Sequence, residues 1–301
     1  MQLRSRKHTA SILLSTDFQQ PAWRAFSYGL NLARGLGARL KILHVIKTAR
    51  DSSGLSPDSR YLNSLRTSAL LQLGRLARLA KEAGVDAEPR LQFGVPDVCI
   101  LESARHDKPK MIVIGTEGRT GWDRLKVGST AQAVIRGASC PVFTVHARVA
   151  GDAFHHPARI TLSRILVATD FSGYSDAILH DVTGLALNLQ TRILIVHVAD
   201  NGIEEKKGQR RMERAIEQAS QYGIEADGLC VPGVPVDAIL NQAARWHADV
   251  IAVGTRGRRR PSHLLIGSVA EGILRRAGCP VLVLQHSSPR GRDESRRSCN
   301  R

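Results

Sequence analysis

Residues 12–18, ILLSTDF, decide the fold, because a closely similar stretch recurs as ILVATDF at residues 165–171. In each copy an apolar run ends in a Thr-Asp pair, a pattern typical of a buried β-strand that stops at a polar turn. The two copies lie 153 residues apart in a chain of 301 residues. A repeat at this distance predicts two homologous modules of about 150 residues each.

Further matches extend the repeat along the chain. The His-Val pair at residues 44–45 recurs at residues 197–198 with the same offset, and the Cys-Pro pair at residues 140–141 recurs at residues 279–280 with an offset of 139. The second copy therefore lacks 14 residues between its second and third strands. Residues 51–58 of the first copy are rich in turn formers, and they predict a loop insertion that accounts for the difference.

These matches divide the chain into two modules and a tail. We expect module 1 at residues 9–148 and module 2 at residues 160–286, joined near residues 151–158. Residues 287–301 are rich in Ser, Arg and Gly and predict a disordered basic tail.

Short apolar runs alternate with longer segments of helical periodicity in each module. Runs of Ile, Val and Leu without polar alternation are typical of strands that are buried on both faces, as in parallel sheets covered by helices. The chain therefore predicts an α/β fold of two tandem Rossmann-like modules, each with five parallel strands and with helices on both faces. In module 1 the expected strands are residues 11–15, 40–46, 86–93, 111–115 and 142–146, and one clear helix is expected at residues 62–83.

Composition narrows the classes of protein. The longest apolar run is far shorter than the 18 or so residues that span a bilayer, and no apolar segment follows the basic first residues. The five cysteines form no CxxC pair and are odd in number, which argues against a disulfide framework or a structural zinc site. We expect a cytoplasmic protein with no membrane partner and no metal held by its own side chains.

One aspartate follows the first strand in each module. In open α/β sheets ligands bind beyond the carboxyl ends of the strands, so Asp17 and Asp170 are candidates to accept hydrogen bonds from a ribose hydroxyl or an adenine amine. The alternative is that each Asp simply caps the next helix, which is a common use of Asp after a strand.

The fourth strand of each module leads into the pattern G-x2-G-x9-G-S. Glycines let backbone amides approach phosphate oxygens, and a helix N-terminus that follows them adds free N–H groups and a favourable dipole. The alternative is a set of turn glycines with Ser as the N-cap, but recurrence of the spacing after the same strand favours phosphate binding. The pattern residues are Gly115, Gly118, Gly128 and Ser129 in module 1 and Gly254, Gly257, Gly267 and Ser268 in module 2.

These residues resemble the universal stress proteins in a tandem two-domain form. The resemblance covers about residues 9–146 and 163–285, and its most specific element is the duplicated glycine pattern. It implies the strand order 3-2-1-4-5 and an ATP site between strands one and four, with a divalent ion such as Mg²⁺ held through the phosphates. It further implies that Asp17, Val45, Asp170 and Val198 contact the adenosine part.

Charged residues in the two glycine loops differ. The position after Gly-Thr, often His in that family, is Glu117 in module 1 and Arg256 in module 2, where residues 258–260 are also Arg. These arginines either attract the triphosphate or form a solvated charge run. If they attract it, site two should bind nucleotide more tightly than site one. Trp122 lies in the first loop, so its fluorescence should respond to ATP at site one.

The leading hypothesis is an ATP-binding stress or signalling protein in which the nucleotide changes conformation or an unknown protein partner. Catalytic residues are not evident, because the chain has no G-x-S-x-G, G-x4-G-K-[ST] or H-E-x-x-H pattern, so we expect weak ATPase activity at most. His44 and His197 are expected to satisfy strand-end hydrogen bonds.

Two other functions stay open. The formal net charge of +16 fits nucleic acid, although only 13 aromatic residues are present to stack on bases, and the fold could also act as a dimerisation scaffold with empty sites. We expect the modules to pair as an intrachain pseudo-dimer through the last strand of each, with a homodimer as a further option.

Overall fold

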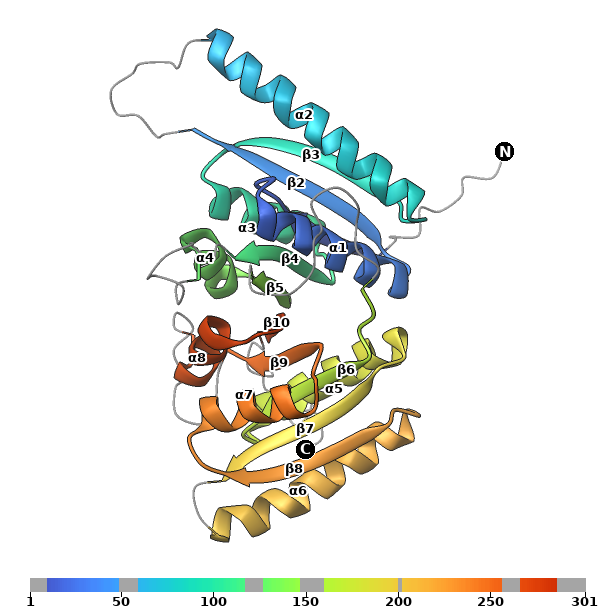
Figure 1. Cartoon of the computed structure of the whole chain (residues 1–301), viewed down its shortest axis with the longest axis vertical. Helices are drawn as coiled ribbons and strands as arrows, with labels where there is room; N and C mark the ends of the chain where they lie inside the picture. Colours follow the sequence, from blue (N-terminus) through green and yellow to red (C-terminus); the bar gives the residue numbers. More distant parts are fainter. Residues whose placement is uncertain are drawn as a thin grey trace, which may run out of the picture.

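The computed structural model of the protein describes residues 10–48, 59–116, 127–146, 160–199, 202–255 and 266–285. Over these ranges the chain forms ten strands and eight helices, alternating as the apolar patterning predicts (Figure 1). The predicted loop insertion at residues 51–58 and the predicted tail at residues 287–301 lie outside the described residues. No helix in the described ranges is both long enough and apolar enough to cross a membrane.

Module 1 has five strands and four helices. They are β1 (Ser11–Ser15), α1 (Gln20–Gly35), β2 (Arg39–Lys47), α2 (Ser59–Glu82), β3 (Ala87–Gly94), α3 (Pro96–Asp107), β4 (Met111–Thr116), α4 (Ser129–Gly137) and β5 (Val142–His146). The predicted strands match within one residue at each end, and the predicted helix at residues 62–83 corresponds to α2.

Module 2 repeats this order. Its elements are β6 (Arg164–Thr169), α5 (Gly173–Leu189), β7 (Arg192–Ala199), α6 (Gly202–Gln221), β8 (Ala226–Pro232), α7 (Pro235–Arg245), β9 (Val250–Gly254), α8 (Ser268–Arg276) and β10 (Val281–Leu284). Helix α6 has 20 residues against 24 in α2, so the shorter second copy has lost helix as well as loop.

The ten strands form one continuous sheet in the order β3-β2-β1-β4-β5-β10-β9-β6-β7-β8. Each half is parallel with the order 3-2-1-4-5, as the family resemblance implies. The halves meet where β10 pairs with β5 in antiparallel orientation, with Leu282 opposite Phe143. The expected pairing through the last strands is therefore confirmed, and it makes one ten-stranded sheet rather than two separate five-stranded sheets.

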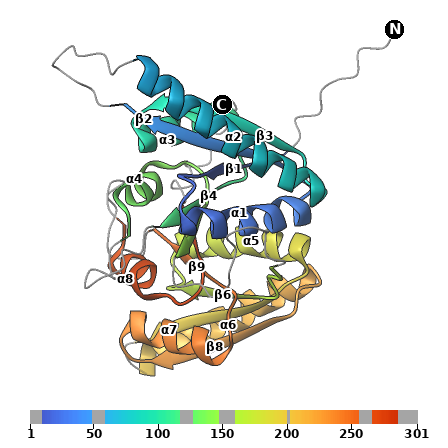
Figure 2. The ribbon, with the colours of Figure 1, turned by 45° about the horizontal axis from the view of Figure 1, so that its top comes forward.

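Helices cover both faces of the sheet (Figures 1 and 2). On one face α1, α2, α5 and α6 pack onto the first apolar cluster, which includes Phe26, Leu73 and Met212. On the other face α3, α4, α7 and α8 pack onto the second cluster, which includes Ile100 and Ile273. Because α1 and α4 cross on opposite faces, the chain leaves the neighbouring strands β1 and β4 in opposite directions. This reversal makes the carboxyl ends of β1 and β4 the switch point of module 1, and the ends of β6 and β9 that of module 2.

Candidate functional site

The two predicted aspartates stand directly after the first strand of each module. The backbone N–H of Gln19 donates to Asp17 Oδ1 over 2.9 Å, and the N–H of Ser172 donates to Asp170 Oδ1 over the same distance. Gln19 and Ser172 are themselves the N-cap residues of α1 and α5, so neither Asp caps its helix, and each instead accepts from the N–H of the N-cap residue. Asp17 is exposed, and its Oδ2 has no partner among the described residues. One carboxylate oxygen therefore remains available to accept a ligand hydrogen bond.

A turn that the sequence analysis did not anticipate closes the same strand end. Thr16 Oγ1 accepts the N–H of Phe18 over 3.0 Å, and the Phe18 ring stacks on His44 with 4.3 Å between centroids. Nδ1 of His44 lies 2.8 Å from the Thr16 carbonyl oxygen and must carry the proton, since a carbonyl only accepts. Module 2 repeats these contacts with Thr169, Phe171 and His197. The prediction that both histidines satisfy strand-end hydrogen bonds is confirmed.

The backbone of this turn is strained in both modules. Phe18 has a φ of 63° and Phe171 a φ of 52°, in the left-handed region that aromatic residues rarely adopt. Such a conformation persists only where the surrounding contacts determine it, and the threonine hydroxyl and histidine ring supply those contacts here. The only sequence signal for the turn is the recurrence of Thr-Asp-Phe with a distant His.

Gly115 at the end of β4 allows α1 to approach the sheet. A Cβ at this position would lie 2.7 Å from the Pro21 carbonyl carbon and 2.8 Å from the Ala22 nitrogen. The close approach is to backbone, which cannot move aside cheaply. The first glycine of the pattern is therefore required for packing at the switch point, whatever it does for a ligand.

The last Gly-Ser pair of the pattern begins a helix in each module. Gly128 is the N-cap of α4 and Gly267 that of α8, so Ser129 and Ser268 are the first helical residues. The alternative in which Ser is the N-cap is therefore wrong. Neither N-cap glycine makes a side-chain cap bond, so within the described ranges no N-cap side chain occupies the first-turn amides. Gly118, Gly257, Glu117, Arg256, Arg258–Arg260 and Trp122 lie outside the described residues.

The sheet register brings the described candidates to one edge. Ser15 pairs with Leu43 on one side and with Ile114 on the other, so the ends of β2, β1 and β4 lie next to one another. Val45 on β2 is half-buried against the second apolar cluster, on the α3 and α4 face. Module 2 places Val198, Asp170 and Gly254 at the ends of the corresponding strands β7, β6 and β9.

Comparison with known proteins identifies the family of this repeated arrangement. The sequence model of the Universal stress protein family matches the chain twice, at residues 9–146 and 161–285. The chain belongs to the universal stress protein family. A universal stress protein from Methanocaldococcus jannaschii is 31% identical over 136 residues, which cover 44% of this chain and 80% of that protein.

Solved structures support the tandem fold of this universal stress protein. A universal stress protein from Archaeoglobus fulgidus superimposes with a TM-score of 0.74 at 24% identity, covering 92% of this chain and 97% of that one. A protein of unknown function from Pseudomonas aeruginosa gives a TM-score of 0.63 at 18% identity, with 92% of each chain covered. At these identities the likeness establishes the fold alone.

The two modules of this universal stress protein differ beside the strand-end turn. In module 2 Arg211 of α6 donates to the Phe171 carbonyl over 2.7 Å, and Ser175 donates to Asp170 Oδ1. Burial raises the pKa of Asp176 above its ordinary value, the positive charge of Arg211 opposes this rise, and the negative charge of Asp170 adds to it. Module 1 has Ala22 and Trp23 in place of Ser175 and Asp176, so the surroundings of the two aspartates are not equivalent.

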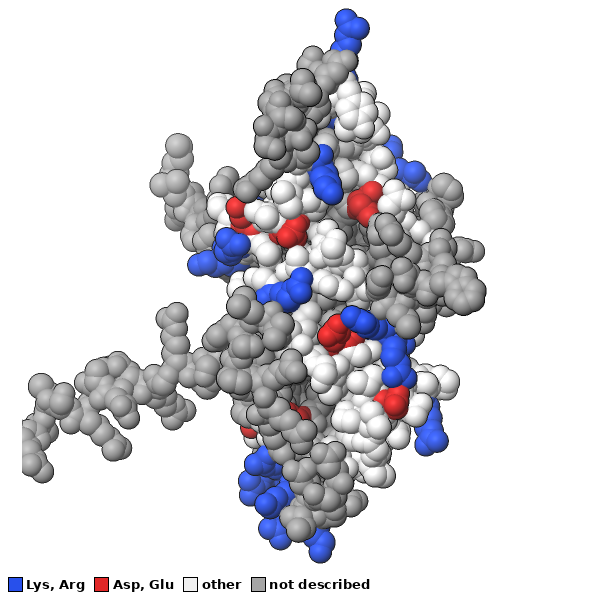
Figure 3. Space-filling model, turned by 90° about the vertical axis from the view of Figure 1, so that its left-hand side faces the viewer, with Lys and Arg blue, Asp and Glu red and all other residues white. Residues whose placement is uncertain are grey.

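Charges of both signs are scattered over the side of the molecule on which α4 and α8 lie (Figure 3). Lys and Arg gather there at the lower end, where Figure 1 shows α6. Within the described ranges no group of three or more His, Cys, Asp or Glu side chains is placed to hold a metal ion.

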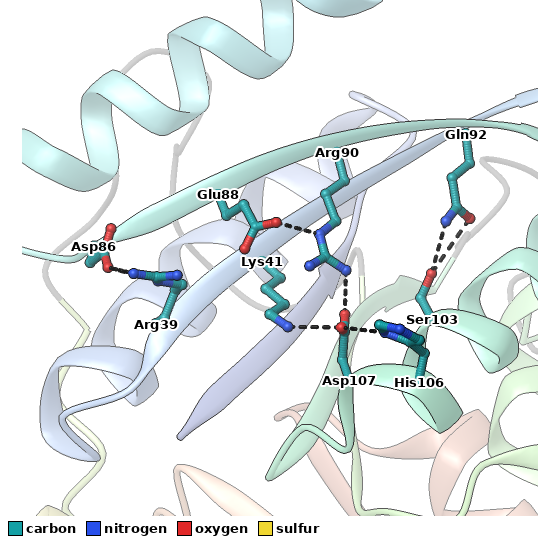
Figure 4. Close-up of polar contacts among 9 residues, drawn as sticks. All are labelled: Arg39, Lys41, Asp86, Glu88, Arg90, Gln92, Ser103, His106 and Asp107. Carbon is teal, nitrogen blue, oxygen red and sulfur yellow. Dashed lines mark hydrogen bonds and ion pairs between the residues drawn. The ribbon is translucent and has the colours of Figure 1, made fainter. Parts of the chain in front are cut away.

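A buried ionic cluster lies in module 1 at the carboxyl end of α3 (Figure 4). The switch-point edge lies at the other end of this helix, where α3 begins. The Asp107 carboxylate, 3% exposed, accepts from Lys41 Nζ over 2.9 Å and also pairs with Arg90. Arg90 pairs in turn with Glu88 over 2.7 Å. Module 2 has Leu194, Leu229 and Trp246 at the positions of Lys41, Arg90 and Asp107. Because module 2 reaches the same fold with apolar residues at these positions, the fold does not require the cluster.

Proposed function

We propose that each module binds an adenine nucleotide at its switch point, and that binding alters the conformation or the protein partner of the molecule in a stress response. One observation carries the proposal. In both modules a strand-end Asp, a half-buried Val and a glycine in the last two residues of the fourth strand lie at the same edge of the sheet. Ligands of doubly wound sheets bind at this place.

The residues suggest a division of roles. The exposed carboxylate of Asp17, and the partly buried carboxylate of Asp170 in module 2, would accept from a ribose hydroxyl or an adenine amine, while Val45 and Val198 would offer apolar contact. The uncapped first turns of α4 and α8, beginning at Gly128 and Gly267, would bind phosphates together with the rest of the glycine pattern. A Mg²⁺ ion bound with ATP would be held by the phosphate oxygens and would neutralise part of their charge.

Binding accounts for these residues better than catalysis does. No described side chain at the two edges is arranged to orient an attacking water, and each strand-end histidine uses its Nδ1 to bind a backbone carbonyl. We therefore infer weak ATPase activity at most.

Calorimetric titration of Mg-ATP into the full chain tests the proposal. We expect two sites, and we expect Gly128→Asp and Gly267→Asp each to remove one, because each adds a carboxylate where phosphate would approach. Gly184→Asp is the matched control, because a Cβ at Gly184 meets nothing within 4 Å. If both loop variants bound two nucleotides like the control, the proposed sites would be wrong.

The same titration ranks the two sites. The site that survives in Gly128→Asp is that of module 2, whose glycine pattern contains Arg256 in sequence, and it should bind ATP about tenfold more tightly than the site that survives in Gly267→Asp, whose pattern contains Glu117. Attraction to arginine and repulsion by the carboxylate give this sign. Equal affinities, or tighter binding in module 1, would contradict the ranking.

The net charge of +16 favours nucleic acid as a second candidate ligand. Binding to a polyanion releases counterions, so the affinity for it falls steeply between about 50 and 200 mM salt. A nucleotide held at the switch point should depend on salt much less. Titration at both salt concentrations with ATP and with duplex DNA distinguishes the two functions.

A further inference from the structure

The outward surface of α2 differs from that of its counterpart α6, although both helices do the same structural work. Ala69, Leu73 and Ala80 of α2 are buried against the sheet, and Gly208, Met212 and Ala219 occupy the corresponding buried positions of α6. A glycine with positive φ follows each helix, at residues 84 and 223. These matches fix the residue-by-residue equivalence of the two helices at an offset of 139.

Apolar side chains project outward from α2. Leu71 is 72% exposed and Leu70 is 49% exposed. The equivalent residues of α6 are Arg210 and Gln209, which are ordinary solvated side chains. The fold itself therefore needs no leucine at either position. Figures 1 and 2 show α2 at one end of the molecule, with every other drawn helix and strand on its inner side.

Gly74 lies one helical turn after these leucines, on the same side of α2. The equivalent residue of module 2 is Glu213. A Cβ at Gly74 would meet nothing within 4 Å, whereas a Cβ at Gly208 of α6 would clash with His197. Glycine weakens a helix relative to alanine. No described neighbour of Gly74 is close enough to exclude a larger residue at this position. The missing side chain instead leaves a notch beside two exposed leucines.

The charges around the notch have one sign. Helix α2 contains five Lys and Arg residues and only one carboxylate, Glu82, at its last position. Arg66, Arg78 and Lys81 are exposed, and none of them pairs with a carboxylate among the described residues. By contrast, α6 interleaves five basic with four acidic residues. Helix α2 therefore has a net charge of +4, from five basic and one acidic residue, against +1 for α6, from five basic and four acidic residues, and its surface favours an anionic partner.

We propose that this surface, the α2 outer face, docks an acidic amphipathic helix of a protein partner. The face comprises Leu70, Leu71, Gly74, Arg66, Arg78 and Lys81. The leucines would pack between apolar side chains of the partner, the notch would let its backbone approach, and the cations would pair with its carboxylates. The proposal is independent of nucleotide binding.

Two other anionic ligands fit this face less well. A phosphodiester backbone offers nothing for exposed leucines to contact, so nucleic acid explains the charge but not Leu70 and Leu71. A bilayer would use apolar bulk, and Gly74 removes bulk from the centre of the face. A helix uses the cations, the leucines and the notch together.

The test uses the full chain and a designed 20-residue peptide with Leu at i, i+3, i+4 and i+7 spacing and Glu on its other face. Fluorescence anisotropy should show binding at least tenfold tighter than that of a scrambled peptide of the same composition. Leu71→Ser and Arg78→Glu should each weaken binding at least tenfold. Arg210→Glu, at the position of α6 equivalent to Leu71, should leave it unchanged.

Gly74→Leu separates docking from folding and from membrane binding. It should raise the melting temperature, because leucine is the better helix former, yet weaken peptide binding at least fivefold by filling the notch. Vesicles of phosphatidylserine and phosphatidylcholine and a 20-base-pair DNA duplex are the competing probes. The proposal is overturned if the designed peptide binds no better than the scrambled one, or if the variants leave the affinity for the peptide unchanged. It is also overturned if vesicles or DNA bind more tightly than the peptide and Gly74→Leu strengthens vesicle binding.

Discussion

A single glycine at the switch point decides how closely α1 can approach the sheet. Gly115→Ala would place a Cβ 2.7 to 2.8 Å from the backbone of Pro21 and Ala22, so the helix must shift. We expect a loss of about 2–3 kcal/mol in the free energy of unfolding, as for other overpacked positions, measured by urea denaturation.

Gly29 provides the matched control on the same interface. A Cβ there would contact side chains of Leu40 and Leu14 at 3.5 and 3.6 Å, which are ordinary distances. Gly29→Ala should therefore raise stability by about 0.5–1 kcal/mol through helix propensity. Destabilisation of the same size in both variants would show that the close approach at Gly115 is not the cause.

The ionic cluster around Asp107 gives module 1 a pH dependence that the apolar residues at the equivalent positions of module 2 do not supply. Burial works against ionisation of Asp107, but hydrogen bonds from Lys41 and His106 and the charges of Arg90 and Lys41 hold its pKa below the usual value. A carboxylate with a lowered pKa in the folded state stabilises at pH above its unfolded value of about 3.9, and this stability is lost as pH falls through the folded pKa. Asp107→Asn should therefore cost about 2 kcal/mol at pH 7 and flatten the loss of stability below about pH 4.

Module 2 suggests the control for this prediction. The variant Lys41→Leu, Arg90→Leu and Asp107→Trp carries the residues that module 2 has at these positions. It should be less destabilised than Asp107→Asn, because it removes the buried charges together instead of leaving the two cations without their anion. A larger loss in the triple variant would show that the cluster contributes net stability through its pairing.

At the scale of elements, the strand-end turn joins β2 to β1 and β7 to β6 through one histidine in each module. His197 is 4% exposed and bonds to the Thr169 carbonyl, whereas His44 is only half-buried. We expect His197→Ala to cost about 2–3 kcal/mol and His44→Ala about 1 kcal/mol, since the deeper side chain leaves the larger cavity and an unsatisfied carbonyl. Urea denaturation of both variants checks the order, and a greater loss for His44→Ala would contradict it.

Elements whose apolar residues are consecutive could be predicted from the sequence almost residue by residue. β1 and β5 have the predicted bounds, because each is a short segment dominated by apolar and β-branched residues that ends in a polar residue. The helix caps at Gly128 and Gly267 could not be predicted, because Gly-Ser fits a serine cap equally well until the backbone is seen. The strained Phe18 could not be predicted either, because its conformation opposes its own preference and depends on His44, 26 positions away along the chain.

Contacts between residues far apart in the sequence could not be predicted either, because no local pattern shows which distant residues meet. The ionic cluster joins β2, β3 and the end of α3, and no local pattern marks Lys41 as its member. The candidate aspartates and glycines were accessible because duplication repeats them with fixed spacing. A repeat therefore reveals shared sites, while features that differ between modules, such as the ionic cluster and the α2 outer face, require the structure.

At the scale of the whole molecule, the joint between modules is as deeply buried as either core. Phe143 is 1% exposed and Leu282, its partner across the joint, is also 1% exposed. Thr144 Oγ1, fully buried, donates to the Val281 carbonyl over 3.0 Å. A joint of this kind couples the two modules, since neither can unfold without exposing the apolar last strand of the other.

We therefore expect the protein to unfold as one cooperative unit. Variants that keep only Trp23 or only Trp246, with the other tryptophans replaced by Phe, report on module 1 and module 2 separately, and their urea midpoints should coincide. Phe143→Ala, a change in module 1, should lower both midpoints together by the equivalent of about 3–5 kcal/mol, because the cavity weakens the shared sheet. Ala69→Gly on α2, at the outer end of module 1, is a control that should shift both midpoints by about 1 kcal/mol. If the Trp246 signal kept its midpoint while the Trp23 signal moved, the modules would be independent units and the buried joint would not transmit stability between them.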